Sequence, residues 1–195
     1  MKILKFLGLL LIGFVLLFFV MGLVKPSVDY GHTITVDKPL KEAWAVHQDV
    51  SKYDQWLEGF KSIKLISGKK GVPGSTYKVV VNPGEGQPDF EMIETVVEYK
   101  KFDLVNLSFD SDMMVFNQTT SFAENNGKTS ITTDSKVNAK GIIMRSMFAI
   151  METFAGSFQK QEEKNLESLK ALINNNEQDY FPAPIEIQTE PQIAM

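Results

Sequence analysis

The sequence predicts an α+β domain in which a curved antiparallel sheet wraps around a long C-terminal helix. Six segments between residues 60 and 138 are rich in β-branched and aromatic residues, which favour strands. Short breaks of Gly, Pro and Asn separate them, including Asn126-Gly127, a strong hairpin signal. From Gly141 to about Asn174 the apolar period becomes helical. Consecutive strands followed by one long helix indicate a helix-grip arrangement.

The N-terminus is predicted to be an uncleaved membrane anchor covering residues 1–27. Residues 6–24 carry no charge, and 19 helical residues span about 28 Å, close to the thickness of a bilayer core. A signal peptide is the alternative. It is disfavoured because its apolar region is usually shorter and Val20-Met21-Gly22 is a poor cleavage site.

The positive charges around this segment bear on its orientation. Lys2 and Lys5 precede it and favour a cytoplasmic N-terminus, whereas Lys25, Lys38 and Lys41 follow it and weaken that bias. We therefore expect a single-pass membrane protein whose domain is extracytoplasmic.

Residues 32–56 predict a strand and two short helices. Thr33 and Thr35 alternate with Ile34 and Val36, and Pro39 then suits the first turn of a helix. The next helix places Leu40, Ala43, Trp44, His47 and Val50 on one face. Ser51 and Asp54 form a capping signal for a second helix, which carries Trp56 and ends near Gly59.

The six later strands are expected to form an antiparallel meander, because their turns are short. Their predicted ranges are 60–68, 75–82, 90–100, 104–111, 114–124 and 128–138. The helix after them would run for about 30 residues as one element. The domain is predicted over residues 28–176, followed by a disordered acidic tail at 177–195 that has no periodicity.

Composition excludes some classes of function. The chain has 195 residues and no Cys, so it has no disulfide, Cys-based metal site or Cys nucleophile. Four of its 24 acidic residues lie in the tail, so the remainder balances the 20 Lys and Arg. A chain that is neutral over residues 1–176 and acidic in its tail lacks the excess of positive charge that is typical of nucleic-acid-binding proteins. The domain is expected to be a monomer.

The segments "ITVDKPLKEAWAVHQDVSKYDQW" and "GSTYKVVV", with the closing helix, resemble the START-like (SRPBCC, Bet v 1-like) superfamily, and its polyketide cyclase/dehydrase-like branch in particular. The resemblance covers roughly residues 30–174 and rests on Pro39, Trp44, Asp49 and Trp56. It implies a cavity between sheet and helix, which binds lipids, sterols, polyketides or other apolar molecules in many members. The anchor and the tail depart from the commonest form of the family.

The segment "MRSMFAIMETFAGSF" (144–158) is more apolar than one helical stripe requires. It could line the cavity or simply fill a core; a second membrane span is disfavoured because Arg145 and Glu152 interrupt it. Together with hydroxyls on the last strand, it supplies the expected pocket-lining residues: Trp44, Trp56, Met144, Met147, Phe148, Met151, Phe154, Phe158, Thr133 and Ser135.

No catalytic motif, metal site or cofactor site is expected. The two histidines, His32 and His47, lie 15 positions apart, which is a weak signal for a metal site. His47 is expected to be a core or boundary residue. Glu91 and Glu94 fall on opposite faces of one strand, so they cannot form a carboxylate pair, and Glu94 is expected to be solvated. Thr133 and Ser135 could bind the polar end of a ligand, although ordinary strand hydroxyls are favoured.

Three functions remain open at this stage. The favoured one is a non-enzymatic binder of a small apolar ligand, held at a membrane through residues 6–24. The others are an interaction or regulatory module with a filled cavity and a cyclase or dehydratase type of enzyme. A filled cavity would favour the module, and a buried ionisable residue facing an open cavity would favour the enzyme.

Overall fold

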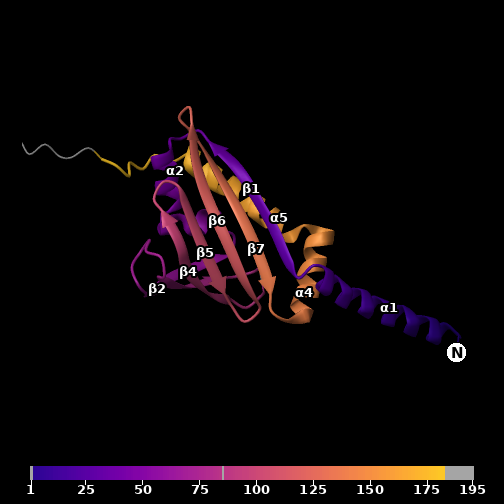
Figure 1. Ribbon diagram of the computed structural model, residues 1–195. Coiled ribbons are helices and arrows are strands. Elements are labelled where there is room, and N and C mark those ends of the chain that lie inside the picture. The colour runs from indigo at the N-terminus through magenta and orange to yellow at the C-terminus, as the bar shows by residue number, and fades with distance from the viewer. Residues whose placement is uncertain (1, 85, 183–195) are drawn as a thin grey trace, which may run out of the picture.

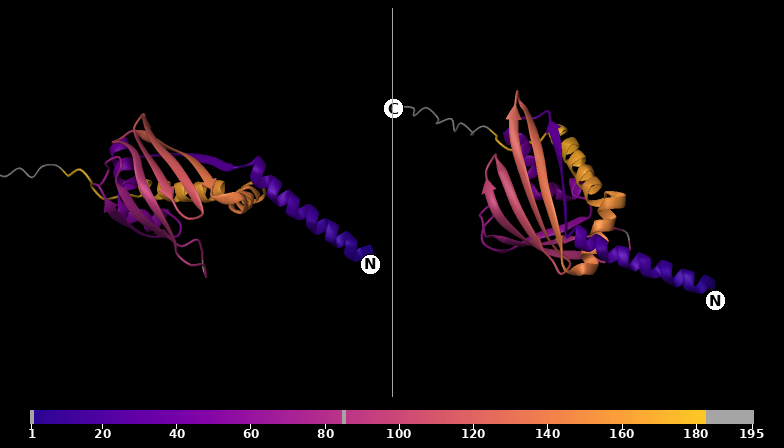
Figure 2. Two further views of the ribbon diagram at one scale, coloured as in Figure 1. Left: turned by 60° about the horizontal axis from the view of Figure 1, so that its bottom comes forward. Right: turned by 45° about the vertical axis from the view of Figure 1, so that its right-hand side comes forward.

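The fold was analysed in a computed structural model that describes residues 2–84 and 86–182. It contains a seven-stranded antiparallel sheet of order β1-β7-β6-β5-β4-β3-β2 (Figure 1). The predicted α+β helix-grip fold is confirmed, since the sheet curves over a C-terminal helix (Figure 2). The strands are β1 (Ser27–Val36), β2 (Phe60–Ser67), β3 (Thr76–Val81), β4 (Phe90–Lys100), β5 (Leu104–Asp110), β6 (Met114–Asn125) and β7 (Lys128–Ala139).

The predicted single C-terminal helix is wrong, because the structure divides it. Helix α4 covers Gly141–Ile150, a π-helical turn η2 covers Met151–Ala155, and α5 covers Ser157–Asn174. Gly156 separates η2 from α5 with φ 59° and ψ 40°, a left-handed conformation that favours glycine. Helical periodicity continues across this break, so the apolar pattern alone did not reveal it.

Two short helices follow β1 and cover one end of the sheet. They are α2 (Leu40–His47) and α3 (Tyr53–Trp56), with the 3-10 turn η1 (Val50–Lys52) between them. The predicted cap at Ser51 and Asp54 is wrong. The Asp49 side chain instead accepts a hydrogen bond from the Ser51 backbone N–H, which makes Asp49 the cap of η1.

The core alternates along the strands as the period-two pattern predicts. In β7, Ile131, Thr133, Ser135 and Val137 are buried and the residues between them are more exposed. One buried cluster centres on Trp44, whose ring meets Tyr99, Phe102 and Phe122 edge-on. The C-terminal half of α5 adds Leu166, Leu169 and Ile173 to that cluster.

A second cluster lies near the junction of β1, β7 and α4. It is built from Val28, Val137, Ala139 and Phe148, with Met144 and Phe158 packed against it. The domain therefore has two apolar clusters, one along α2 and the C-terminal half of α5, and one beneath α4.

The N-terminal helix α1 (Lys2–Val24) extends away from the domain (Figure 1). It is long and apolar enough to cross a membrane. Only its last turns touch the domain, where Gly22 lies against α4. A Cβ at Gly22 would sit 2.4 Å from Ser146 Oγ and 3.0 Å from the Ile142 carbonyl oxygen, so a larger residue would separate the two helices.

Residues just after α5 contact the rest of the domain although they form no helix or strand. The Tyr180 hydroxyl donates a hydrogen bond of 2.7 Å to Asp49 Oδ2, and the Asn176 carbonyl accepts one of 3.3 Å from Lys38 Nζ. The predicted disorder of residues 183–195 lies outside the described residues.

The packing of α5 makes a testable prediction about stability. Leu169→Ala removes a fully buried side chain from the Trp44 cluster and should lower the free energy of unfolding by ~2–5 kcal/mol. The control Leu65→Ala, at an exposed position on β2, should change it by less than ~1 kcal/mol. Chemical denaturation of both variants provides the measurement. Equal effects would contradict the assignment of α5 to the core.

Candidate functional site

A cavity with a volume of about 800 Å³ lies between the sheet and the helices α3 and α5. This volume falls within the range of pockets that bind small molecules, ~300–1,000 Å³. Its apolar wall comes mainly from the inner faces of β3, β4, β5 and β6: Val79, Val81, Met92, Val105, Leu107, Phe109 and Phe116. Leu57, Phe60 and Ile63 extend the wall beyond α3.

The cavity lies between the two core clusters because α5 changes its role along its length. Its C-terminal half carries Leu166 and Leu169 into the Trp44 cluster. Its N-terminal half instead presents Phe158, Glu162 and Asn165 to the cavity. Strands β1 and β6 contact this half of the helix, where Gln159 bonds Gly31 and Glu162 bonds Gln118. Strands β3, β4 and β5 do not pack closely against it, so the space between them and the helix stays open.

Glu94 is an acidic group in the sheet wall of the cavity. Its side chain is 8% exposed, and it has no hydrogen-bond or ion-pair partner among the described residues. Burial raises the pKa of this carboxyl to about 7. The expectation that Glu94 is solvated is therefore wrong. Parity correctly placed Glu94 opposite Glu91, but β4 has its inner face covered, and Glu94 lies on that face.

Two aromatic hydroxyls lie close enough to respond to the Glu94 charge. Tyr53, from α3, has its pKa raised mainly by burial and next by Glu94. Tyr77, paired with Glu94 across β3 and β4, shows the same two causes. Only Tyr53 lines the cavity. Both tyrosines are therefore neutral at pH 7 and add no charge next to Glu94.

Trp56 and His47 form a polar corner of the same cavity. The Trp56 indole Nε1 is buried and has no acceptor among the described residues. Its ring lies 5.5 Å from the His47 ring, centroid to centroid. Burial lowers the pKa of His47 to about 4, so the imidazole is neutral at pH 7, and its Nδ1 lies 2.9 Å from Gln48 Nε2. The predicted core histidine is buried as expected, and it also reaches the cavity wall.

The opposite wall holds a second buried carboxyl, which has a partner. Gln118 Nε2 donates to Glu162 Oε1 at 3.1 Å and to Ser135 Oγ at 3.2 Å. Burial raises the pKa of Glu162, whereas hydrogen bonding to Thr133, the nearby His32 and the contact with Gln118 act in the opposite direction. Tyr30 completes this side of the wall, with its ring stacked 5.7 Å from Phe158.

The structure brings together three of the ten residues predicted to line the cavity: Trp56, Met151 and Phe158. The others lie elsewhere. Trp44 is the centre of its own cluster, behind His47 and Phe122.

Two more of the ten, Phe148 and Met144, belong to the cluster beneath α4. The Phe148 ring lies 5.2 Å from Phe158, so it supports the wall from behind.

Four remaining residues do not reach the cavity, for local reasons. Thr133 Oγ1 lies 3.4 Å from both the His32 N–H and its carbonyl oxygen, and Ser135 is already bonded to Gln118. Met147 and Phe154 point outward from α4 and η2 and are exposed. The segment 144–158 is therefore partly core, partly cavity wall and partly exposed surface.

Sequence reasoning missed Glu94, Glu162, Tyr30 and Tyr53 as cavity residues. Parity on β4 contained the signal for Glu94, which shares a face with Met92 and Val96. Helical spacing contained the signal for Glu162, which lies four residues before Leu166 and is buried with it. No group of three or more His, Cys, Asp or Glu suited to a metal ion occurs in the part of the chain that the structure describes.

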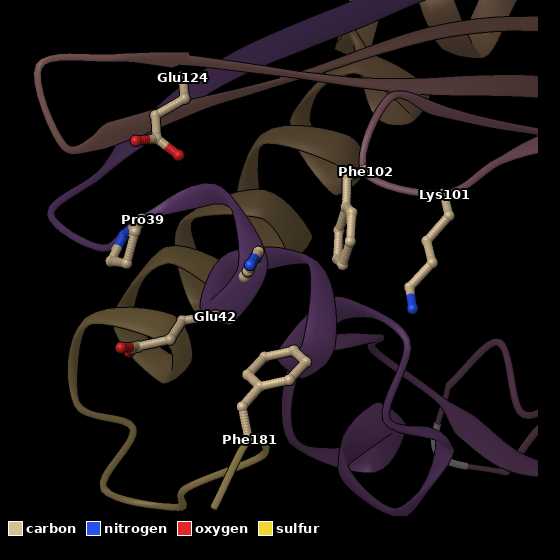
Figure 3. Close-up of a pocket in the computed structure, with 7 residues that line it drawn as sticks. Pro39, Glu42, Lys101, Phe102, Glu124 and Phe181 are labelled. Atoms are coloured by element: carbon tan, nitrogen blue, oxygen red, sulfur yellow. The ribbon is translucent and has the colours of Figure 1, made fainter. Parts of the chain in front are cut away.

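A smaller hollow of about 510 Å³ lies at the other end of the domain (Figure 3). Pro39 and Glu42 come from the start of α2, Glu124 from the β6–β7 hairpin, and Phe181 from the C-terminal segment. Its polar groups are largely satisfied, since Glu124 accepts a hydrogen bond from the Leu40 N–H and Glu42 pairs with Lys38. We therefore take the larger cavity as the candidate site.

Comparison with known proteins identifies the fold. No protein-family model matches the sequence, and no curated protein is similar enough to count as a relative. Among solved structures, Ara h 8.0201 superposes with a TM-score of 0.59 at 12% identity, covering 77% of this chain and 99% of that one. The Zhui aromatase/cyclase from Streptomyces sp. R1128 gives 0.57 at 10% identity, covering 75% and 93%.

The di-domain ARO/CYC BexL from the BE-7585A biosynthetic pathway gives a TM-score of 0.57 at 12% identity. The match covers 78% of this chain and 52% of BexL, so the chain spans about half of that protein. The resemblance noted in the sequence is thus confirmed at the level of the fold: the chain has the helix-grip fold shared by Bet v 1-like proteins and polyketide aromatase/cyclases.

Proposed function

We propose that this protein is a membrane-anchored binder of a small, largely apolar ligand that carries a polar group. The observation that carries the proposal is the open cavity of about 800 Å³ between α5 and the sheet. Most of its wall surface is apolar, and polar side chains such as Glu94, Gln118 and Glu162 also line it, a combination found in small-molecule sites. Its open volume argues against the alternative of an interaction module with a filled cavity.

The polar groups of the cavity indicate what the ligand offers them. The Trp56 Nε1 has no acceptor within the described part of the chain, but it has almost no accessible surface, so it does not present a donor to a ligand in the cavity. Glu94 is half-protonated near pH 7, so it can donate to one oxygen or accept from a hydroxyl. An amphiphile with an apolar body and an oxygen-bearing end satisfies Glu94, whereas a hydrocarbon leaves this carboxyl unpaired at a cost.

Helix α1 supports the anchoring part of the proposal. It meets the length and hydropathy requirements of a span, and few of its residues are covered by the domain. A helix of this kind in a soluble protein would have to be buried, and α1 is not.

An acid–base enzyme is the second candidate, and Glu94 favours it. A buried carboxyl with a pKa near 7 that faces a cavity is a common feature of general acids and bases. Two of the structural neighbours are named as aromatase/cyclases. We rank binding first because Glu94 has no neighbouring group among the described residues with which to form a proton-transfer pair: His47 is neutral at pH 7, and Glu162 accepts a hydrogen bond from Gln118.

Filling the cavity should remove binding. Met92→Trp places a larger ring in the cavity wall, whereas Ile93→Trp places the same ring on the outer face of β4. We expect Met92→Trp to weaken binding of the neutral apolar probe Nile red at least ~10-fold, and Ile93→Trp to leave it unchanged. Fluorescence titration of each full-length variant in amphipol measures its affinity for the probe. Probe that dissolves in the amphipol gives the same background for both variants, so the difference between them reports binding to the cavity.

Stability distinguishes an open cavity from a filled one in the same variants. An open cavity accepts the added ring, whereas overpacking a filled core costs ~1–3 kcal/mol. If Met92→Trp is strongly destabilised and wild-type protein binds no probe, the binding proposal is wrong.

The pKa of Glu94 predicts a pH dependence of folding. Its pKa is raised from 4.5 to about 7 in the folded protein, so between these pH values the unfolded chain loses a proton that the folded chain keeps. The free energy of unfolding should therefore fall as pH rises from about 4.5 to 7, by up to roughly 3 kcal/mol for this group. Glu94→Gln should remove this decline and leave the variant more stable than wild type at pH 8.

Glu91→Gln is the matched control, since Glu91 lies on the same strand, exposed, and pairs with Lys78 at 2.7 Å. Denaturation from pH 4 to pH 8 should separate the Glu94 variant from wild type and from the Glu91 variant. Three parallel curves would show that Glu94 is solvated and would remove it from the candidate site.

The anchor predicts the mass of the mature protein. Because residues 6–24 are expected to remain as a span, the intact mass of protein from the membrane fraction should include α1. A mature chain that begins near residue 23 and is recovered without detergent would instead identify α1 as a signal sequence.

A further inference from the structure

An apolar stripe runs along the outer side of α4 and η2. Its members are Ile143, Met147, Met151 and Phe154, which are 62%, 39%, 40% and 78% exposed. Their spacing of four, four and three residues places them on one side of the helical segment. We call these four residues the outer stripe. Phe154 and Ile143 have most of their surface uncovered by the described residues, whereas Phe148 and Ala149 on the inner side of α4 are buried.

Helix α4, which carries Ile143 and Met147 of the outer stripe, lies beside the end of α1 (Figure 2). Gly22 packs against the backbone of α4 at Ser146, and Lys25 Nζ donates a hydrogen bond of 2.9 Å to Thr153 Oγ1 in η2. Both α4 and η2 are therefore tied to residues 22–25. Gly22 lies only about 3 Å along the helix axis from Val24, the last residue of α1.

If α1 spans a bilayer, the attachment of α4 and η2 to residues 22–25 determines how deep these two elements lie relative to the bilayer. The last turn of a spanning helix lies where the hydrocarbon core meets the headgroups. A helix packed against that turn lies at the same level. An exposed apolar side there costs free energy in water but is stabilised when it enters the boundary between headgroups and acyl chains.

We propose that the outer stripe docks into the surface of the bilayer that α1 crosses. The proposal rests on the anchoring role of α1 given above and adds a second attachment. The occupant of this surface is lipid, because the stripe is exposed on a helix that packs against the last turn of α1. The protein would thus be attached by two helical elements: α1, which spans the bilayer, and α4 with η2, which lie at its surface. Together they orient the domain on the membrane.

Met151 joins the outer stripe to the cavity, because it is 40% exposed and also lines the cavity wall. A docked stripe therefore places this part of the cavity rim next to lipid. The ligand class that follows is an amphiphile dissolved in the bilayer, which enters or leaves past Met151 without crossing water.

Site-directed fluorescence in the full chain tests the docking. The chain has no Cys, so single substitutions give single labelling sites. Ile143→Cys and Phe154→Cys report on the outer stripe. Ile66→Cys is the matched control, since Ile66 is apolar and 56% exposed, and its strand β2 lies at the edge of the sheet opposite β1, the strand that follows α1. Each variant is labelled with a polarity-sensitive dye and placed in phosphatidylcholine–phosphatidylglycerol vesicles with or without brominated acyl chains.

We expect the bromines to quench the dyes at positions 143 and 154 several-fold more than the dye at position 66. Equal quenching at the three positions would overturn the docking. Leu16→Cys, in the middle of α1, separates this result from failure of the anchor. Quenching at 16 without quenching at 143 and 154 means that α1 spans and the stripe does not dock, whereas no quenching at any position overturns both.

Ligand exchange tests the role of the rim. The double variant Ile143→Asp, Phe154→Asp should slow, several-fold, the transfer of a dansyl-labelled fatty acid from the vesicle to the cavity, followed by energy transfer from Trp56 and Trp44. Its affinity for Nile red in amphipol should stay at the wild-type value, because neither residue lines the cavity. An unchanged transfer rate would overturn the exchange of ligand through the bilayer.

Discussion

The structure depends on the contact between α5 and the curved sheet. Leu166, Leu169 and Ile173 close one end of that contact through the Trp44 cluster. The other end is closed by Phe148 and its neighbours beneath α4. Between the clusters the sheet curves away from the helix, and the side chains there do not fill the gap. The cavity thus arises because the curved sheet contacts the helices through two apolar clusters and stays apart from α5 between them.

The same geometry explains the unusual state of Glu94. A carboxyl on the inner face of β4 would be paired if the helix were close enough to supply a partner. Across the cavity it has none among the described residues, so burial dominates and its pKa rises to about 7. Glu162 is buried to a similar degree, yet Gln118 is near enough to hydrogen-bond it. Glu94 therefore lies on the side of the cavity where no described side chain is near enough to bond it, and Glu162 lies on the side where α5 and β6 are in contact.

Patterns of period two and of helical period predicted most of the fold, including the strands and the approximate extent of the C-terminal helical region. They failed at Gly156, because apolar spacing continues through the break that its left-handed backbone makes. They also failed to separate three environments within residues 144–158. Phe148, Met151 and Phe154 are all apolar and helically spaced, but they face the core, the cavity rim and the exterior. Which of the three environments each residue occupies depends on the direction of helix α1 and on the curvature of the sheet. Neither can be inferred from the sequence of residues 144–158.

The central claim is that the cavity holds a ligand in the folded protein, and mass spectrometry of organic extracts tests it most directly. Full-length wild type, Ile93→Trp and Met92→Trp would be purified in the same detergent from the same membranes. The account predicts an amphiphile with an oxygen-bearing end that is present in near-stoichiometric amount in wild type and Ile93→Trp and is depleted in Met92→Trp. Extracts in which the three proteins carry the same compounds, at the level of bulk lipid, would contradict it.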